Sequence, residues 1–383
     1  MRNNFSRRDF LKVAGVGLGA LAFNPFKRLD VYYEKLYTPK RLPQFPTGDI
    51  IGRVVDDTDV RSRPDNNPLL NNSVGVVPAD TVFPWGREVI GKVAALTNQR
   101  YLEIQQGFIW ASRVQPTKNL PNTPITALPQ GQSGFWAEVT VPYIDLTLEG
   151  VAASPWLKSK QEYNFPPRVY YGQVIWIDQI RQNNGFVEYR WNEGADGHGY
   201  GYGPYGEFFW LDGAGVKVLT DQDVAPISPD VDPNEKKIVA DVTYQTLSCF
   251  EGNNEVFFCR ISSGQKYDAN GEVSDKLATP VGDLSAWWKI ISKNMTAGNE
   301  QAGYSTPAVP WCTFISGEGV AIHGAFWHND FGERRSHGCI NVTPEEAKWI
   351  FRWTTPFISV EKSEQRLSFP DHGTAVTVSE LKV

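Results

Sequence analysis

Short stretches in which apolar and polar residues alternate run through most of the chain, and turn-forming residues separate them. A period of two residues is typical of half-buried β-strands. Several such stretches crowd residues 49–118, which predicts a small β-barrel there. The stretches are Gly52–Val55, Val60–Pro64, Ser73–Val77, Thr81–Phe83, Tyr101–Ile104 and Gly107–Trp110.

Residues 131–226 carry the same kind of pattern, with strands predicted around 168–178, 186–191 and 207–212. An opening strand, a central pair and a terminal Phe-Trp-Leu stretch follow in the same order as in 49–118. This order suggests a second β module that is a diverged copy of the first. The Pro-rich segment 24–48 is expected to be a linker.

Residues 234–361 form a third predicted domain, which opens with a β-hairpin around Gly252 and Asn253. Pairing about this turn places Cys249 near Val256, so free thiols are favoured for Cys249 and Cys259. A bulge in one strand would still allow the two sulfurs to meet. Residues 362–383 are expected to be a C-terminal tail.

Thr343 to Glu346 reads Thr-Pro-Glu-Glu, which is a capping box with Pro at the first helical position. It predicts a short helix, 345–352, in an otherwise mainly β protein. This helix would begin only a few residues after Cys339.

Composition supports this organisation. The chain has 383 residues, 34 Gly and 26 Pro, and turn formers at that density favour short strands over long helices. Its length allows about two to three domains. The formal net charge of -6 leaves no electrostatic footprint for binding nucleic acid. Four cysteines are too few for a disulfide scaffold, so each is judged as a possible chemical group.

The N-terminus carries Arg7-Arg8, followed by Phe10, Leu11 and Lys12 and then by the apolar run 13–23. That run is about half of the ~20 residues that span a bilayer, so no membrane span is expected in the mature protein. The segment resembles a twin-arginine export signal. Residues 1–23 are therefore expected to be a signal peptide and the protein to work outside the cytoplasm, whereas the alternative is a basic N-terminus on a short buried helix.

Candidate chemistry concentrates between residues 320 and 342. Cys339 follows a glycine at a predicted strand-to-turn site, and a cysteine acts as a nucleophile through its thiolate. His323, near the end of an apolar stretch, is the candidate general base, with its second ring nitrogen held by a carbonyl such as that of Gly324. His337 would share a face with Cys339 on an extended backbone, but not if the chain turns.

Backbone N–H groups of His337, Gly338 and Cys339 are candidates to surround a developing oxyanion. A zinc site is the alternative, because imidazole and thiolate are ligands that the metal prefers. Its ligands would be His323, His328, His337 and Cys339. The expected spacing motifs of a metal site are absent, so neither a metal nor another cofactor is predicted.

These residues resemble the L,D-transpeptidase catalytic domain of the YkuD family. The family pattern, a His in an Ile-His-Gly strand followed by Ser/Thr-His-Gly-Cys-aliphatic-Asn/Arg, is filled by His323, Gly324 and the run from Ser336 to Asn341. Thr279-Pro-Val-Gly282 falls where the family has a Thr-Pro-x-Gly turn. The resemblance covers about residues 234–361.

The resemblance implies a β-sandwich with Cys339 and His323 in a groove, supported by Gly324, Ser336 and Asn341. It also implies a cysteine acyl-enzyme formed with peptidoglycan stem peptides, which serve as donor and acceptor, and acylation by carbapenems. Activity is expected to rise with pH as the Cys-His pair reaches its reactive state. The stretch His328–Gly332 is expected to be a lid, and Cys312 a packed core thiol.

The first β module resembles bacterial SH3-like modules of cell-wall proteins, on Val60–Pro64 and Gly107–Pro116. This implies association with the wall. Three functions stay open at this point: an L,D-transpeptidase that forms cross-links, an L,D-carboxypeptidase on the same scaffold, and a wall-binding protein without catalysis.

Overall fold

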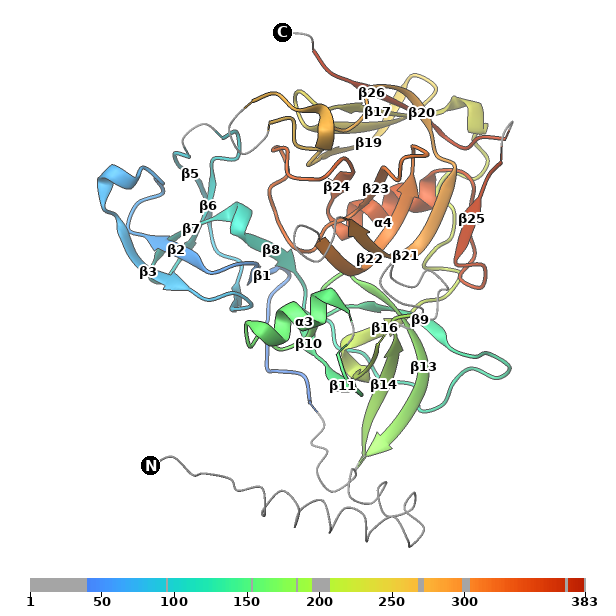
Figure 1. The fold of residues 1–383 in the computed structure, drawn as a ribbon, viewed down its shortest axis with the longest axis horizontal. Helices are drawn as coiled ribbons and strands as arrows, with labels where there is room; N and C mark the ends of the chain where they lie inside the picture. Colours follow the sequence, from blue (N-terminus) through green and yellow to red (C-terminus); the bar gives the residue numbers. More distant parts are fainter. Residues whose placement is uncertain are drawn as a thin grey trace, which may run out of the picture. The chain divides into compact units, whose positions relative to one another are not determined.

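The computed structural model describes residues 40–383, apart from 94–95, 153, 184, 195–206, 268–271, 298–303, 369–370 and 382–383. The predicted signal peptide, 1–23, and most of the predicted linker lie outside the described residues. Residues 41–383 form one compact unit, built mainly from β-strands, as the alternation predicts (Figure 1). No helix within the described part of the chain is both long and apolar enough to span a bilayer.

The first β module contains two small sheets, ordered β4-β1-β8 and β3-β2-β7-β6-β5. Its last strand returns to pair antiparallel with its first, β8 against β1. The elements are β1 (Ile51–Val54), β2 (Thr58–Arg61), η2 (Pro68–Leu70), β3 (Ser73–Val77), β4 (Val82–Pro84), β5 (Glu88–Ile90), β6 (Arg100–Ile104), β7 (Gly107–Trp110), η3 (Ala111–Arg113) and β8 (Val114–Thr117).

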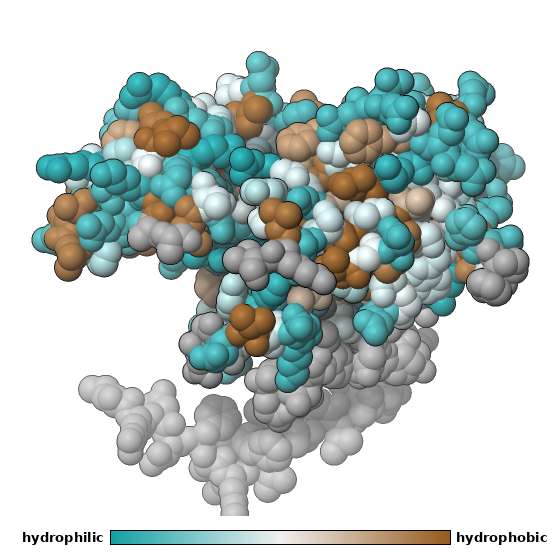
Figure 2. Space-filling view, turned by 90° about the horizontal axis from the view of Figure 1, so that it is seen from above, coloured by the Kyte–Doolittle hydropathy of each residue, from teal (hydrophilic) through white to brown (hydrophobic). Residues whose placement is uncertain are grey.

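Apolar side chains are exposed on the first β module where η2 and β3 lie (Figure 2). Leu69, Leu70, Val74 and Val76 are all exposed there, and β3 is an edge strand of its sheet. Unpaired backbone groups at such an edge are open to pairing with another chain.

The second β module has one large sheet, ordered β11-β15-β14-β13-β9-β16, and the pair β10-β12. It ends as the first module does, with a strand, a 3-10 turn and a strand, and β16 pairs with the opening strand β9. The elements are β9 (Phe135–Val139), β10 (Tyr143–Asp145), β11 (Thr147–Glu149), α3 (Pro155–Glu162), β12 (Arg168–Tyr170), β13 (Val174–Asn183), β14 (Phe186–Asn192), β15 (Phe208–Asp212), η4 (Gly213–Gly215) and β16 (Val216–Val218).

The end of the predicted linker packs on this second module. Leu42 and Phe45 contact its hydrophobic core, and the Leu42 N–H donates to Asp212 at 2.9 Å. Residues 41–48 are therefore a packed segment in the structure rather than a free joint, because two of their apolar side chains find a partly buried position.

The C-terminal domain stacks two sheets around a core that also holds α4 (Figure 1). One sheet runs β19-β18-β17-β26-β20 and the other β24-β23-β22-β21-β25. The elements are η5 (Pro233–Glu235), β17 (Lys236–Asp241), β18 (Thr246–Glu251), β19 (Asn254–Arg260), η6 (Asp275–Leu277), β20 (Gly282–Ser285), β21 (Trp288–Ala297), β22 (Tyr304–Phe314), β23 (Ala321–Gly324), β24 (Ile340–Val342), α4 (Pro344–Trp353), β25 (Glu364–Arg366) and β26 (Ala375–Ser379).

Two expectations for this domain are corrected. The predicted tail, 362–383, contains β25 and β26, and β26 lies inside a sheet between β17 and β20. In the β18–β19 hairpin a bulge after Cys249 places this residue opposite Phe257 rather than Val256. Cys259 faces Leu247, and all four cysteines are free thiols.

Candidate active site

Two parallel strands, β23 and β24, position the predicted catalytic pair. Ile322 pairs with Ile340 and His323 with Asn341, and Cys339 immediately precedes β24. Ile322 and Ile340 point into the core between the two sheets. Because side chains alternate along a strand, His323, Asn341 and Cys339 fall on the opposite face. The register therefore brings Cys339 and His323 to one side of the sheet.

A second hydrophobic cluster lies under this face. Its buried members are Trp288, Ile290, Val309, Cys312, Phe314 and Ala321. Cys339 and Trp327 both pack against it, and the Trp327 ring lies 5.8 Å from the His323 ring, centroid to centroid. Trp327 is thus next to the imidazole and belongs to the same apolar surroundings as the thiol.

The His323 side chain is only 2% exposed, and its Nδ1 lies 3.2 Å from the carbonyl oxygen of Gly324. A carbonyl only accepts, so Nδ1 carries the ring proton and Nε2 keeps its lone pair. Burial lowers the pKa of His323 to about 4, although the hydrogen bond to Gly324 acts in the opposite direction. The imidazole is therefore a neutral base at neutral pH, in the tautomer that the sequence suggested.

Cys339 is partly buried, whereas Cys249, Cys259 and Cys312 are fully buried. Burial raises the pKa of the Cys339 thiol to about 11, and a hydrogen bond from the Ala321 backbone N–H partly offsets this effect. In the resting protein a neutral thiol and a neutral imidazole thus share one face of these strands, in place of the ionised sulfur expected from the sequence. The physical reason is that the base is itself too buried to hold a proton and supply a positive charge.

A tight turn precedes the nucleophile. Gly338 has φ of 121°, a conformation that favours glycine, and the exposed His337 consequently does not share a face with Cys339. The Gly338 N–H donates to Ser336 Oγ at 3.1 Å, and Ser336 Oγ in turn donates to the Cys339 carbonyl. Ser336 therefore fixes the turn, and its bond removes the Gly338 N–H from the predicted oxyanion cluster.

Thr279 is a buried residue that the sequence analysis placed only in a family turn. Its hydroxyl accepts from the Gly264 N–H at 2.8 Å and donates to the Gly338 carbonyl at 2.8 Å. It therefore fixes the backbone beside Cys339. The Thr-Pro-x-Gly motif was the available signal. It did not reveal that Thr279 binds the Gly338 carbonyl, because the two residues lie far apart in the sequence.

His328 and Asn341 form a second buried polar pair. The Asp330 N–H donates to His328 Nδ1 at 3.1 Å, and the side-chain amide of Asn341 lies 3.0 Å from Nε2. Since Nδ1 accepts, the neutral ring carries its proton on Nε2, which requires the amide oxygen of Asn341 to face it. Burial lowers the pKa of His328 to about 3, with help from Arg335. Asn341 thereby supports the strand that carries Cys339.

Residues 325–335, which we call the spacer loop, connect β23 to the Ser336 turn. The sequence predicted a lid over the groove at 328–332, and the structure corrects this expectation. His328, Asn329, Asp330 and Phe331 are all buried. They are covered because the loop packs against the first β module, as hydrogen bonds from Asn329 to Ala111 and Val114 show.

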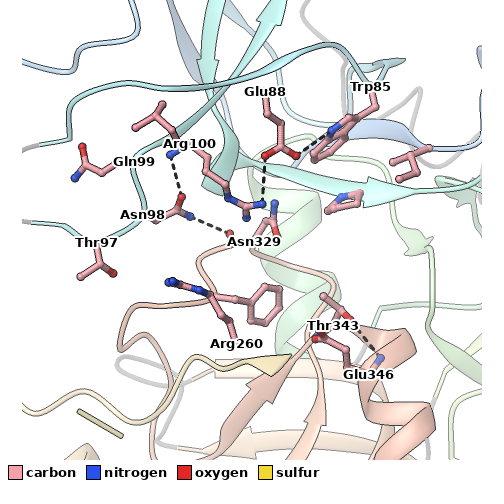
Figure 3. A pocket seen from close by; sticks show the side chains of 14 residues that line it. Trp85, Glu88, Thr97, Asn98, Gln99, Arg100, Arg260, Asn329, Thr343 and Glu346 are labelled. Carbon is pink, nitrogen blue, oxygen red and sulfur yellow. Dashed lines mark hydrogen bonds and ion pairs between the residues drawn. The ribbon is translucent and has the colours of Figure 1, made fainter. Parts of the chain in front are cut away.

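A cavity of about 580 Å³ opens beside this contact (Figure 3). Trp85, Glu88 and Arg100 line it from the first β module, and Arg260 and Glu346 line it from the C-terminal domain. Neither Cys339 nor His323 is among its lining residues. Within the described residues no group of three or more His, Cys, Asp or Glu side chains is arranged to hold a metal ion.

Part of the chain matches a known protein family. Residues 235–378 match the YkuD family model, described as the L,D-transpeptidase catalytic domain. These residues are therefore similar to an L,D-transpeptidase catalytic domain, and the match extends past residue 361 through most of β26.

Among curated proteins, the chain is 28% identical over 169 residues to L,D-transpeptidase 2 of Mycobacterium tuberculosis (strain CDC 1551 / Oshkosh). The match covers 38% of each protein, so the chain spans only that share of the length of its relative. Among solved structures, the catalytic domain of the Enterococcus faecium L,D-transpeptidase is 22% identical, with 38% of this chain and 98% of that chain covered and a TM-score of 0.28. An L,D-transpeptidase from Mycobacterium smegmatis is 18% identical, with 53% and 98% covered and a TM-score of 0.30.

Proposed function

We propose that the protein is a peptidoglycan L,D-transpeptidase that works through a Cys339 acyl-enzyme. The carrying observation is the pair itself: a partly exposed thiol just before β24 and a buried imidazole on β23, on the same face of the sheet, with Nδ1 held by the Gly324 carbonyl. This arrangement leaves Nε2 as the atom that exchanges a proton with the thiol. The family match over residues 235–378 supports the substrate class.

In the acylation half-reaction, Nε2 of His323 takes the thiol proton as sulfur attacks the carbonyl that precedes the terminal D-residue of a stem peptide. The tetrahedral oxyanion forms beside the Ser336 to Cys339 turn. Collapse breaks the carbon–nitrogen bond, and the proton on His323 moves to the leaving amine. The products are a thioester on Cys339 and a free D-amino acid.

In the second half-reaction, the amine of another stem peptide attacks the thioester. His323 takes a proton from this amine and returns one to the departing sulfur, so that the thiol is restored and an amide cross-link forms. A neutral resting pair suits both halves, because the base is unprotonated before each attack.

The same proposal covers the rest of the chain. The first β module resembles bacterial SH3-like modules of cell-wall proteins. The second module ends with the same strand, 3-10 turn and strand, which favours a shared origin. We therefore include association of both modules with the cell wall in the proposal. The Arg7-Arg8 signal favours twin-arginine export and an extracytoplasmic, wall-associated location.

The test incubates the full mature chain with purified muropeptides and measures the product masses. Dimers that lack one D-residue are expected, and Cys339→Ala should give none. Cys312→Ala is the matched control. It also removes a thiol, but Cys312 is buried in the adjacent hydrophobic cluster, so this variant should keep activity. Shortened monomers alone would indicate an L,D-carboxypeptidase, and unchanged substrate would indicate a binding protein.

A further inference from the structure

The spacer loop is held by the first β module at three separate points. These anchors are Phe326, Asn329 and the pair Gly332-Glu333. The loop lies directly between the strand of His323 and the turn of Cys339 in the sequence. A β module that would otherwise serve only to bind the wall thus contacts the segment that joins the two catalytic residues.

Asn329 is the central anchor and is 4% exposed. Its side-chain amide donates to the carbonyls of Ala111 at 3.0 Å and Val114 at 2.9 Å, and its backbone N–H donates to Ser112 at 3.1 Å. Its own carbonyl accepts from the Asn98 side chain at 3.5 Å, a contact that is visible in Figure 3. Every one of these partners belongs to the first β module, and three of them lie in or beside η3.

Glu333 is the second anchor. One oxygen of its carboxylate accepts from the backbone N–H groups of Thr97 and Asn98, the latter at 3.0 Å, and lies 2.6 Å from the Thr97 hydroxyl. The same hydroxyl lies 2.9 Å from the carbonyl of Gly332. Four hydrogen bonds therefore converge on Gly332 and Glu333 from Thr97 and Asn98.

Arg53 supplies the third anchor from β1. Its buried guanidinium donates to the carbonyl of Phe326 at 2.6 Å and is fixed by Asp80 at 2.7 Å and Gln115 at 2.8 Å. The Phe326 ring stacks on the ring of Tyr170 from the second β module, with 5.9 Å between the ring centroids. The Arg53 guanidinium also lies over the Tyr170 ring, 4.1 Å from its centroid. Both modules therefore meet the loop here.

The anchors flank the two loop residues that touch the site. Trp327 and His328 lie between Phe326 and Asn329, and Trp327 contacts the ring of His323. His328 contacts Asn341, which pairs with His323 and follows Cys339 by two residues. A displacement of the loop would therefore move the neighbours of both the base and the nucleophile.

We propose that the first β module is a positioning element of the catalytic site, and that Asn329 and Glu333 are the positioning residues through which it acts. The proposal rests on the proposed function, since it assigns the module a role in the Cys339 reaction. The module holds Trp327 and His328 in place, and they in turn orient His323 and Asn341. Correct orientation of reacting groups is worth orders of magnitude in rate.

The test uses the full mature chain with Glu333→Ala, Glu333→Gln and Asn329→Ala, and with Glu361→Ala as an exposed control of the same chemistry. The rate constant for acylation by imipenem is measured by intact mass, and alkylation by iodoacetamide reports the accessibility of Cys339. We expect both loop alanine variants to acylate roughly tenfold more slowly. Glu333→Gln should recover most of the rate, because its amide oxygen can still accept from Thr97 and Asn98.

Alkylation should not slow in any variant, since Cys339 still lies just before β24 and stays partly exposed. Unchanged imipenem rates in both alanine variants, or a Glu333→Gln rate as low as that of Glu333→Ala, would overturn the positioning role. A wild-type protein that takes up no imipenem would contradict the proposed function instead. Amide hydrogen exchange then tests whether the anchors hold the loop, independently of the reaction. Residues 326–333 should exchange faster in Glu333→Ala than in Glu361→Ala, and equal exchange would show that Glu333 does not anchor the loop.

Discussion

At the scale of single residues, burial sets the protonation of the candidate catalytic pair, Cys339 and His323, more than mutual attraction does. Desolvation is the largest cause of both shifts, downward for the pKa of His323 and upward for the pKa of Cys339. Between about pH 4 and pH 11 the uncharged pair is accordingly the resting form. In the proposed mechanism, a base that is neutral across this range takes the thiol proton only as sulfur attacks.

We predict that the rate constant for imipenem acylation has a plateau from about pH 5 to 9 and falls as the pH drops toward 4, where His323 becomes protonated. This differs from the rise with pH that the sequence suggested, because the burial that lowers the pKa of His323 is a tertiary property that the sequence does not show. Stopped-time intact-mass measurements at each pH would check it. A rate that rises steadily between pH 6 and 9 would contradict the prediction.

The acid limb needs a folding control. The folded-state pKa of His323 and of His328 lies below the ordinary value of 6.5, so the unfolded chain binds more protons as the pH falls from about 6.5 toward 4. Stability is consequently lost through this window. Circular dichroism at each pH separates a loss of base from a loss of fold.

The sequence suggested Cys339 and His323 as the candidate pair because the proposed chemistry depends on residue types at a short spacing. It did not locate Asn329 or Glu333, because their partners at 97–98 and 111–114 lie more than two hundred residues away. Hydrogen bonds to backbone groups also cannot be predicted from the residue type of the partner, because every residue type has a backbone carbonyl. Residue roles that depend on long-range contacts therefore required the structure.

At the scale of elements, α4 shows how local signals and tertiary contacts combine. Thr343 Oγ1 accepts from the Glu346 N–H at 3.3 Å, and Glu346 accepts from the Thr343 N–H at 2.9 Å, which completes the predicted capping box. At the other end, the buried Lys289 side chain donates from Nζ to the carbonyls of Phe351 and Thr354. Burial lowers the pKa of Lys289 well below its usual range, so its contribution here is counted as hydrogen bonds to the last carbonyls of the helix.

We predict that Thr343→Ala lowers the free energy of unfolding by about 1 kcal/mol, since it leaves an N-terminal N–H of α4 without its side-chain acceptor. Thr343→Ser should keep most of this stability, because its hydroxyl can make the same bond. Urea unfolding followed by circular dichroism measures both. If the serine variant loses as much as the alanine variant, the cap is not the cause.

Strand pairing was harder to predict than this helix. The strands of the first β module and the β18–β19 hairpin follow from alternation and turn residues, which are local. The bulge at Cys249 and the helix α3 did not follow. α3 lies within a module whose composition favoured strands, and the bulge is one extra residue that shifts the register by a single position.

At the scale of the whole molecule, one hydrophobic core joins the second β module to the C-terminal domain. Trp136 and Val174 of the module belong to the same cluster as Ile322, Ile340 and Phe351. The first β module contributes the polar anchors described above. Strands β23 and β24 are therefore supported from both modules. Domain limits taken from Pro-rich segments divide the sequence, but they do not show that the three parts share packing contacts.

The longest-range pairing of this core places β26 between β17 and β20. β26 pairs in parallel with β17, from Lys237 with Ala375 to Asp241 with Ser379, and Val376 and Val378 are each 1% exposed. No local pattern reveals such a contact, because the two strands lie well over a hundred residues apart. For this reason the sequence assigned residues 362–383 to a tail.

We predict that a protein ending at Glu361 does not fold cooperatively, whereas one ending at Leu381 does. The shorter chain loses β26, which opens the edges of β17 and β20 and removes two buried valines from the core, and large cavities of this kind cost several kcal/mol. The longer chain keeps every paired residue of that strand. Thermal unfolding and the fraction of soluble protein compare the two chains. If the shorter chain unfolds in one transition at the same midpoint temperature as the longer chain, β26 is dispensable for folding and residues 362–383 behave as a tail.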